Sequence, residues 1–555
     1  MIDDRLLGVK KPARYIGKEW NVSEKMLDSA RLKVCLCFPE MYEVGMSNLG
    51  IRILYSILNG IEGVACERAF APDADMEKFL RENKLALFSL ESQRPLADFD
   101  LLGFGVGYEL SFTNILAMLD LAGLPLLSSQ RDRSHPLVIA GGTSVFNPEP
   151  IADFIDAFFI GEAEEACAEI VEVILRHKGD SGKEKLLEEL ARIEGVYVPS
   201  LPGKVKKRVV CDLEKAHFPR KWLVPYIQVV HDRVTVEIMR GCPNRCRFCQ
   251  ARSQYFPLRV RKPGTVRQLC EELYRNTGYE EITLTGLSVS DYPYLKEVAG
   301  PLLQELKKEG ASLSLPSMKP KSFLGELSTL IAAVKKTGLT FAPEAGNAKM
   351  REVLGKDFNE DDFFATLEQA YQSGYQHVKL YFMIGLPHET QQDLDDIIDL
   401  TRRVSELRRK IKGRPAQVNV SVNTVIPKAH TPFQWLAMAG LEEMRSKQEY
   451  IRDKARNRNF RFTFHNRFMS LLEGVFSRGD RQLSRVILAA FNKGARSDGW
   501  DEYFRFELWQ EAFKECGIDP ESYLRQRDTN EVLPWDFIDT GVPRDELLRE
   551  YLAIK

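Results

Sequence analysis

Short apolar runs with little polar alternation recur through the first third of the chain, and stretches with helix-like apolar periodicity separate them. Strands that are apolar on both faces and alternate with helices are typical of a parallel sheet that helices cover on both sides. Residues 31–185 are therefore predicted to form a Rossmann-like α/β domain, after a polar lead-in segment at residues 1–30. The strand candidates of this domain are residues 33–38, 101–106, 137–140 and 157–160.

A second alternation of strand-like and helix-like stretches begins near residue 231, after a connector at residues 186–230 that is punctuated by proline and glycine. Its six strand–helix units predict a partial (β/α)6 barrel over residues 231–440, short of the eight units of a complete barrel. Residues 441–555 have a helical, charged pattern and predict a helical C-terminal domain. The strand candidates of the barrel are residues 234–239, 282–285, 313–315, 339–341, 378–383 and 418–425.

The composition narrows the class of protein. Of the 555 residues, 44% are hydrophobic and 28% are charged, and the net charge is −2 at pH 7. These values exclude a disordered chain, a fibre and a protein that lies mainly in the bilayer. Because no secretory-type or membrane-spanning apolar stretch is visible, we expect a cytoplasmic protein with no membrane partner. Thiols stay reduced in the cytosol, so clustered cysteines are interpreted first as metal ligands.

Three of the ten cysteines stand close together in the loop after the first barrel strand. Cys242, Cys246 and Cys249 have the spacing C-x3-C-x2-C, and three soft thiolates suit an iron–sulfur cluster. On a four-iron cluster they would leave one iron open to a ligand. A structural zinc site usually needs four ligands, and a stripe of packed helical cysteines is disfavoured by Pro243.

Together with Phe248, which precedes the last cysteine, this loop resembles the signature of the radical S-adenosylmethionine (radical SAM) superfamily. The resemblance implies a 4Fe–4S cluster held by Cys242, Cys246 and Cys249, with S-adenosylmethionine (SAM) chelated to the open iron. One-electron reduction then yields a 5′-deoxyadenosyl radical, so a reductant such as flavodoxin or ferredoxin is an implied partner. The six strand–helix units match the partial barrel of this family.

The resemblance also implies contacts to SAM from loops that follow the barrel strands. After the second strand the family usually has two glycines and a glutamate, whereas residues 285–288 of this chain read Thr-Gly-Leu-Ser. This departure leaves Gly286 and Ser288 for the contact there. The complete implied set is Phe248, Gly286, Ser288, Ser317, Glu344 and Gly385.

Local structure alone also accounts for two of these residues. Gly385 lets a backbone approach a ligand closely, but Thr390 and Asp393 just downstream fit a capping box at a simple helix start. Glu344 can accept hydrogen bonds from the ribose hydroxyls or the ammonium group of SAM, or it can be an exposed loop glutamate. The sequence names no catalytic residue.

Glycine-rich segments follow the strands of the first domain, where parallel sheets bind ligands; ordinary tight turns are the alternative. The motifs GG at residues 141–142, NPEP at 147–150 and GEAEE at 161–165 resemble, in this order, the cobalamin-binding (B12) domain of one radical SAM class. Residues 441–555 resemble the C-terminal segment of an uncharacterised bacterial subfamily of that class. The D-x-H-x-x-G motif of an axial histidine is absent, so cobalamin is expected without that ligand, or the domain has lost it. The implied cobalamin residues are Ser47, Gly141, Gly142, Thr143, Gly161 and Glu162.

These resemblances predict a cobalamin-dependent radical SAM enzyme that methylates an unactivated carbon of an unknown substrate. One alternative is radical rearrangement or oxidation without methyl transfer, and another is a non-catalytic Fe–S or cobalamin-binding protein associated with RNA. Basic clusters at residues 402–414 and 452–461 leave an RNA substrate open, although a solvated helix face is the commoner explanation of such clusters. A methylthiotransferase would need a second cluster, and the first domain shows no second cysteine trio.

Overall fold

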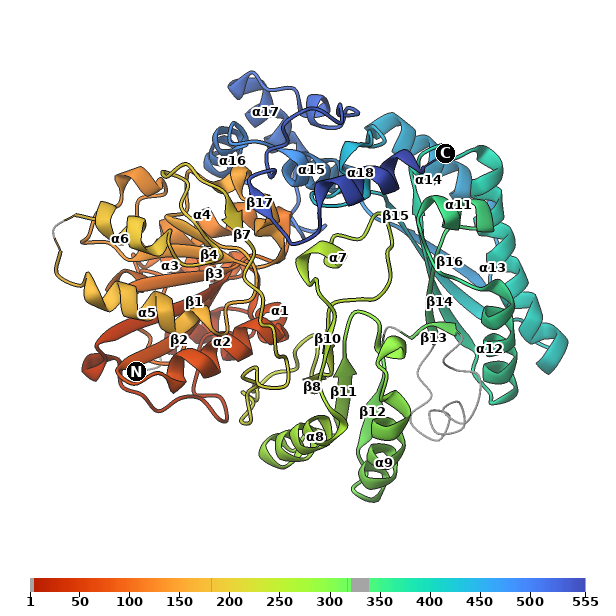
Figure 1. Ribbon diagram of the computed structural model, residues 1–555, viewed down its shortest axis with the longest axis horizontal. Coiled ribbons are helices and arrows are strands. Elements are labelled where there is room, and N and C mark those ends of the chain that lie inside the picture. The colour runs from red at the N-terminus through yellow and green to blue at the C-terminus, as the bar shows by residue number, and fades with distance from the viewer. Residues whose placement is uncertain (1–3, 181, 317, 321–338, 555) are drawn as a thin grey trace.

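The computed structural model describes residues 4–180, 182–316, 318–320 and 339–554, and Ser317 therefore lies outside the described residues. Figure 1 shows an N-terminal α/β domain on the left, a barrel-like domain below and to the right, and a helical group above both. The predicted architecture, a Rossmann-like domain, a partial barrel and a helical C-terminal domain, is confirmed. Within the described residues no helix is both long and apolar enough to cross a membrane.

The first domain is a six-stranded sheet in the order β2-β1-β3-β4-β5-β6, parallel except for β6. Helices α2 (Leu49–Gly60), α5 (Ala166–Arg176) and α6 (Glu184–Leu190) cover one face, and α3 (Ala74–Glu82) and α4 (Phe112–Leu121) cover the other. The strands are β1 (Leu32–Phe38), β2 (Val64–Phe70), β3 (Leu101–Gly105), β4 (Leu137–Gly141), β5 (Ala157–Phe159) and β6 (Val196–Tyr197).

Strand β2 was missed by the sequence pattern because it contains buried charges. All seven of its residues are buried, Glu67 and Arg68 included. The Arg68 guanidinium lies 2.8 Å from Glu19 Oε2 and 2.6 Å from Glu91 Oε1, and its side chain has no exposed surface. A buried charge is tolerated only when it is paired, and this pairing lets an apparently polar segment form a fully buried strand at the edge of the sheet.

The barrel domain consists of two parallel sheets, ordered β12-β11-β8 and β13-β14-β15-β16. The first contains β8 (Val234–Glu237), β11 (Glu281–Thr285) and β12 (Ser312–Ser314); the second contains β13 (Leu339–Glu344), β14 (His377–Ile384), β15 (Gln417–Thr424) and β16 (Phe460–Phe464). The covering helices are α8 (Pro263–Thr277), α9 (Leu295–Lys308), α11 (Ala348–Val353), α12 (Glu360–Gln372), α13 (Gln391–Lys412) and α14 (Leu441–Lys454).

The barrel extends past the predicted boundary at residue 440. Strand β16 pairs in parallel with β15, and Ile451 of α14 belongs to the core of this second sheet. The sequence pattern hid β16 because its phenylalanines alternate with Arg461 at the end of a basic cluster. The six predicted strands are present, and β16 adds a seventh parallel strand to them.

The helical group comprises α15 (Arg467–Arg478), α16 (Leu483–Asn492), α17 (Phe506–Cys516) and α18 (Arg544–Leu552). It packs against the first domain, so that one continuous apolar core contains Ile115 of α4 together with Leu472 of α15 and Val486 of α16. A short parallel pairing of β17 (Ile538–Asp539) with β7 (Val205–Lys206) joins it to the connector. The C-terminal domain is thereby tied to the first domain and to the connector.

Replacing Arg68 by Met should destabilise the first domain. The change leaves Glu19 and Glu91 buried without their cation, and breaking a buried ion pair costs about 3–5 kcal/mol. We expect the midpoint of urea unfolding, followed by circular dichroism, to fall well below that of the wild type. Lys78→Met, which removes an exposed partner of Glu82, is the matched control and should leave the midpoint unchanged. Equal midpoints for both variants would contradict this account of β2.

Candidate functional site

The cysteine loop is held in place by a small antiparallel pairing at its two ends. Strand β9 (Met239–Arg240) pairs with β10 (Arg259–Val260), and the loop leads into α7 (Ala251–Gln254) between them. Gly241 opens the loop with φ of 92°, and a Cβ there would lie 2.8 Å from the carbonyl oxygen of Tyr255. Only glycine fits this position, so the start of the loop is fixed by backbone contact.

Cys242, Cys246 and Cys249 all line one cavity of about 710 Å³ between the two sheets of the barrel. They are free and half-buried. Burial raises the pKa of Cys246 to about 11 and also raises the pKa of Cys249, whereas nearby Lys356 acts to lower both. Across the described residues no three Cys, His, Asp or Glu side chains converge on a single metal ion.

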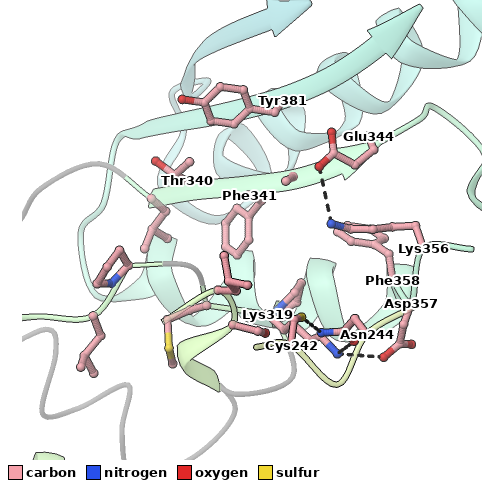
Figure 2. A pocket seen from close by; sticks show the side chains of 18 of the residues that line it. Cys242, Asn244, Lys319, Thr340, Phe341, Glu344, Lys356, Asp357, Phe358 and Tyr381 are labelled. Carbon is pink, nitrogen blue, oxygen red and sulfur yellow. Dashed lines mark hydrogen bonds and ion pairs between the residues drawn. The ribbon is translucent and has the colours of Figure 1, made fainter. Parts of the chain in front are cut away.

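Asn244, inside the first gap of the cysteine motif, connects a thiol to a polar network (Figure 2). Its Nδ2 donates to Cys242 Sγ at 3.2 Å and to Asp291 Oδ2 at 2.9 Å. Its Oδ1 accepts from Lys319 Nζ at 2.7 Å, and Lys319 also lies 3.1 Å from Asp357 Oδ2. The sequence did not predict this network. The only sign of it was the position of Asn244 between Cys242 and Cys246.

Ser288 lines the same cavity, but its hydroxyl donates to Asp291 Oδ2 at 2.7 Å. Asp291 thus receives hydrogen bonds from Ser288 and Asn244 and lies 3.3 Å from Lys319 Nζ. Residues 285–288 lack the glutamate that the family usually has after the second strand. Asp291, three residues after Ser288, supplies a carboxylate nearby instead. This carboxylate stands beside the cysteine loop without having been predicted.

Glu344 lies across the cavity from the cysteine loop and faces Lys356, whose Nζ is 3.5 Å from Glu344 Oε1 (Figure 2). It adopts a φ of 66°, which is uncommon for a residue other than glycine, where the pairing of β13 with β14 shifts register. Burial raises the pKa of its carboxyl, and Lys356 opposes that shift. The exposed loop glutamate that the sequence left open is therefore not what the structure contains.

The remaining residues implied for SAM occupy different places. Phe248 lines the cavity, and Gly286 lies against Met239, whose Cγ would be 2.5 Å from a Cβ at that position. Gly385 has φ of 77° and donates its N–H to Glu389 Oε2, ahead of the capping box that begins α13. The capping box at the start of α13 is therefore observed, and the contact of Gly385 with SAM stays a prediction. Phe248 connects it to the cysteine loop by packing in one apolar cluster with Met383, Leu386 and Val425.

The last helix of the chain, α18, binds the cysteine loop and the start of α7 through ion pairs. Arg252 of α7 makes a two-pronged ion pair with Glu550, at 2.6 and 2.8 Å, and Arg245 pairs with Glu546. The Arg252 side chain is almost fully buried. Ile554 packs beside the apolar cluster that contains Phe248. These contacts join residues about 300 positions apart in the sequence, and no sequence motif predicts them.

The first domain holds the same loop from the other side. Arg240, which precedes the first cysteine by two residues, lies 2.7 Å from Glu164 and 3.2 Å from Glu162. Arg259 donates to both oxygens of Glu162, at 2.6 and 2.8 Å. Glu162, implied for cobalamin, therefore fixes the barrel against the first domain in this structure.

The other residues implied for cobalamin also have partners within the chain. A Cβ on Gly142 would lie 2.4 Å from the Val106 carbonyl oxygen, and one on Gly161 would lie 2.2 Å from that of Arg208. These close backbone contacts require glycine without any ligand. Gly141 ends β4 and pairs with neighbouring strands, Thr143 Oγ1 donates to the Gly107 carbonyl, and Ser47 Oγ donates to the Glu43 carbonyl.

Residues 497–503 of the C-terminal domain lie over the carboxyl ends of β1 and β3. Trp500 Nε1 donates to Glu40 Oε2 there, at 2.9 Å. Parallel sheets of this kind bind ligands at that edge. As arranged, the edge is occupied by the chain itself, and the residues present do not fit a corrin ring.

Several residues of the basic clusters pair with neighbouring carboxylates. Arg402 pairs with Asp399, Arg403 with Glu360, Arg409 with Glu406 and Lys454 with Asp395. Most of these pairs lie on exposed helix faces. This pattern favours the solvated-face interpretation over a dedicated RNA surface.

Comparison with known proteins places the chain among radical SAM proteins. Residues 50–199 match the family model described as radical SAM proteins, N-terminal, and residues 236–401 match that of the radical SAM superfamily. An uncharacterised protein of Methanocaldococcus jannaschii is 29% identical over 468 residues, 82% of this chain and 90% of that protein. The ribosomal protein uS12 methylthiotransferase RimO of Desulfotalea psychrophila is 27% identical over 247 residues, and the match covers 40% of this chain and 54% of that enzyme.

Among solved structures, the radical SAM methyltransferase TsrM of Kitasatospora setae, with cobalamin and a [4Fe-4S] cluster bound, is similar with a TM-score of 0.49 and 15% identity. The similarity covers 73% of this chain and 76% of that one.

Glu550→Gln should loosen the cysteine loop while leaving every thiol in place. The variant removes the charge that pairs with the buried Arg252 guanidinium. After anaerobic reconstitution with iron and sulfide, we expect its visible absorbance to decay about tenfold faster in the presence of a chelator, which corresponds to about 1.4 kcal/mol. Asp545→Asn, on the exposed side of the same helix, is the control and should decay like the wild type. Equal decay of E550Q and wild type would show that α18 does not position the loop.

Proposed function

This chain belongs to the radical SAM superfamily, and we propose that it cleaves S-adenosylmethionine reductively at a 4Fe–4S cluster held by Cys242, Cys246 and Cys249. The observation that supports this proposal is the position of the three thiols around one cavity between the sheets of the barrel. When bound, the cluster supplies the electron that cleaves the sulfonium and yields a 5′-deoxyadenosyl radical. A small electron carrier such as flavodoxin or ferredoxin is the proposed reductant.

The chain's own residues would orient and shield the reactants. Asn244 donates to Cys242 Sγ, and a hydrogen bond to a cluster thiolate tunes the reduction potential of the cluster. Lys319 and Asp291, 3.3 Å apart beside the cysteine loop, would offer opposite charges to the carboxylate and ammonium groups of the methionine part of SAM. Glu344 stands across the cavity as a hydrogen-bond acceptor for a hydroxyl or ammonium group. The apolar walls, Phe341 and Phe358 among them, restrict water around the radical.

Methylation of an unactivated carbon with cobalamin in the first domain is the finer outcome that the sequence predicted. It requires a corrin at the carboxyl edge of the first sheet, and that edge is occupied by residues 497–503. The occupied edge favours radical rearrangement or oxidation, which need no corrin, as the second candidate. The substrate of either reaction is left open, RNA included.

Methylthiolation is the activity of RimO, one of the relatives named above, and it requires a second cluster. The remaining cysteines of the first domain are Cys35 and Cys37 in β1, Cys66 in β2 and Cys167 in α5, and all four are buried. Their positions in the sequence do not have the close spacing of a second cluster motif. We therefore do not propose this activity.

The proposed function predicts 5′-deoxyadenosine from anaerobically reconstituted protein with SAM and dithionite. Cys246→Ala removes one cluster ligand and should reduce the product, measured by mass spectrometry, to the level of a protein-free control. Cys211→Ala, at an exposed cysteine outside the loop, is the matched control and should behave like the wild type. Undiminished product from C246A, or none from fully clustered wild type, would contradict the proposal.

A further inference from the structure

The strands of the barrel domain are apolar on one face and polar on the other. Val236 of β8 and Leu284 of β11 belong to the core that α8 and α9 cover, and Val420 of β15 belongs to the core that α13 covers. The alternate residues point away from these helices, toward the interior of the barrel. Hydroxyl and amide side chains predominate among them: Thr235, Thr283, Thr285, Ser312, Ser314, Thr340, Asn419, Ser421, Asn423 and Thr463.

This polar lining differs from that of an ordinary parallel barrel. Parallel strands are usually apolar on both faces, and closed barrels are filled by bulky branched side chains. Hydroxyls and amides do not pack into such a core, because each of them needs water or a ligand as its hydrogen-bond partner. The interior is therefore suited to a polar ligand. Thr340 and Tyr381 of this interior also line the cavity that the three thiols line (Figure 2).

The strand register gathers part of the lining into one row across the second sheet. The row consists of four residues, each the partner of the next: Thr340 of β13, Lys379 of β14, Asn419 of β15 and Arg461 of β16. All four are exposed. Neighbouring strands are about 4.8 Å apart, so the backbones of Lys379 and Arg461, two strands apart, are separated by about 10 Å. The row thus presents two cations with an amide between them.

These two cations are the charges on the barrel strands that lack an opposite charge. The three glutamates on these strands are each paired: Glu237 with Arg240 at 2.9 Å, Glu281 with Arg233 at 3.0 Å and Glu344 with Lys356 at 3.5 Å. Lys379 Nζ lies 4.7 Å from the centroid of the Tyr381 ring. In the part of the chain that the structure describes, no carboxylate pairs with Lys379 or Arg461. The unpaired charge of the interior is therefore positive.

We propose that the substrate carries a phosphate and a hydroxylated ring, the chemistry of a nucleotide unit, and that it binds along this row with its phosphate on Lys379 and Arg461. Phosphate forms strong charge-assisted hydrogen bonds with lysine and with the planar fork of arginine. From backbones about 10 Å apart, the two long side chains can converge on one phosphate or hold two successive ones.

The rest of the row complements the sugar and the base. Asn419 and Ser421 can exchange hydrogen bonds with ring hydroxyls, and Tyr381 offers an aromatic ring on which a base can stack. An apolar substrate would instead leave these groups without partners. The inference rests on the proposed function, because it takes the interior beside the thiols as the place of reaction.

The test measures binding, on anaerobically reconstituted full-length protein with SAM and without a reductant. Fluorescein-labelled octauridylate is followed by fluorescence anisotropy, and uridine 5′-monophosphate by equilibrium dialysis. Uridine is chosen because an adenosine probe would compete for the site of SAM. The inner-face variant is Lys379→Gln, Arg461→Gln. The control, Lys410→Gln, Lys412→Gln, removes two exposed cations from α13, which covers the other face of the same sheet.

We expect at least one probe to bind, and the inner-face variant to bind it about tenfold more weakly than the wild type and the control, because phosphate contacts are lost. Binding of the octamer alone would indicate a nucleotide unit within RNA, and binding of the monophosphate would indicate a free nucleotide. Equal affinities of the inner-face variant and the control would overturn the proposal, as would failure of both probes to bind. Deoxyadenosine formation is measured separately, and its absence would contradict the proposed function instead.

Discussion

The pairing of buried arginines is the constraint on which the site depends. Arg240 and Arg252 flank the cysteine motif and are almost fully buried, so each needs a carboxylate within reach. Their partners come from opposite ends of the chain: Glu164 belongs to the first domain, and Glu550 belongs to the last helix. The cysteine loop can therefore take its observed shape only when all three domains are assembled around it.

This constraint explains why the domains are packed so closely. The first domain reaches the barrel through Glu162 and Arg259, and the C-terminal domain shares one apolar core with α4 of the first domain. The same packing that fixes the loop also seats residues 497–503 at the edge of the first sheet. The domain packing that holds the cysteine loop therefore also covers the carboxyl edge of the first sheet.

The sequence predicted the local features and missed the distant ones. Apolar strands such as β1 and β4, and the cysteine motif itself, are visible because their patterns are contiguous. Strand β2 was hidden because Arg68 is buried by pairing with Glu19 and Glu91, which come from other segments. The clamp by Glu550 could not be predicted either, since an exposed-looking helical glutamate gives no sign of a partner about 300 residues away.

The central claim is that the cavity beside the three thiols presents an open iron of a 4Fe–4S cluster to S-adenosylmethionine. Electron paramagnetic resonance of the reduced, anaerobically reconstituted full chain tests it most directly, with spectra recorded before and after SAM is added. We expect the signal of a reduced four-iron cluster, and we expect this signal to change when SAM binds, because the ligand contacts the iron itself. A cluster signal that saturating SAM leaves unchanged, or a metal content dominated by zinc, would contradict it.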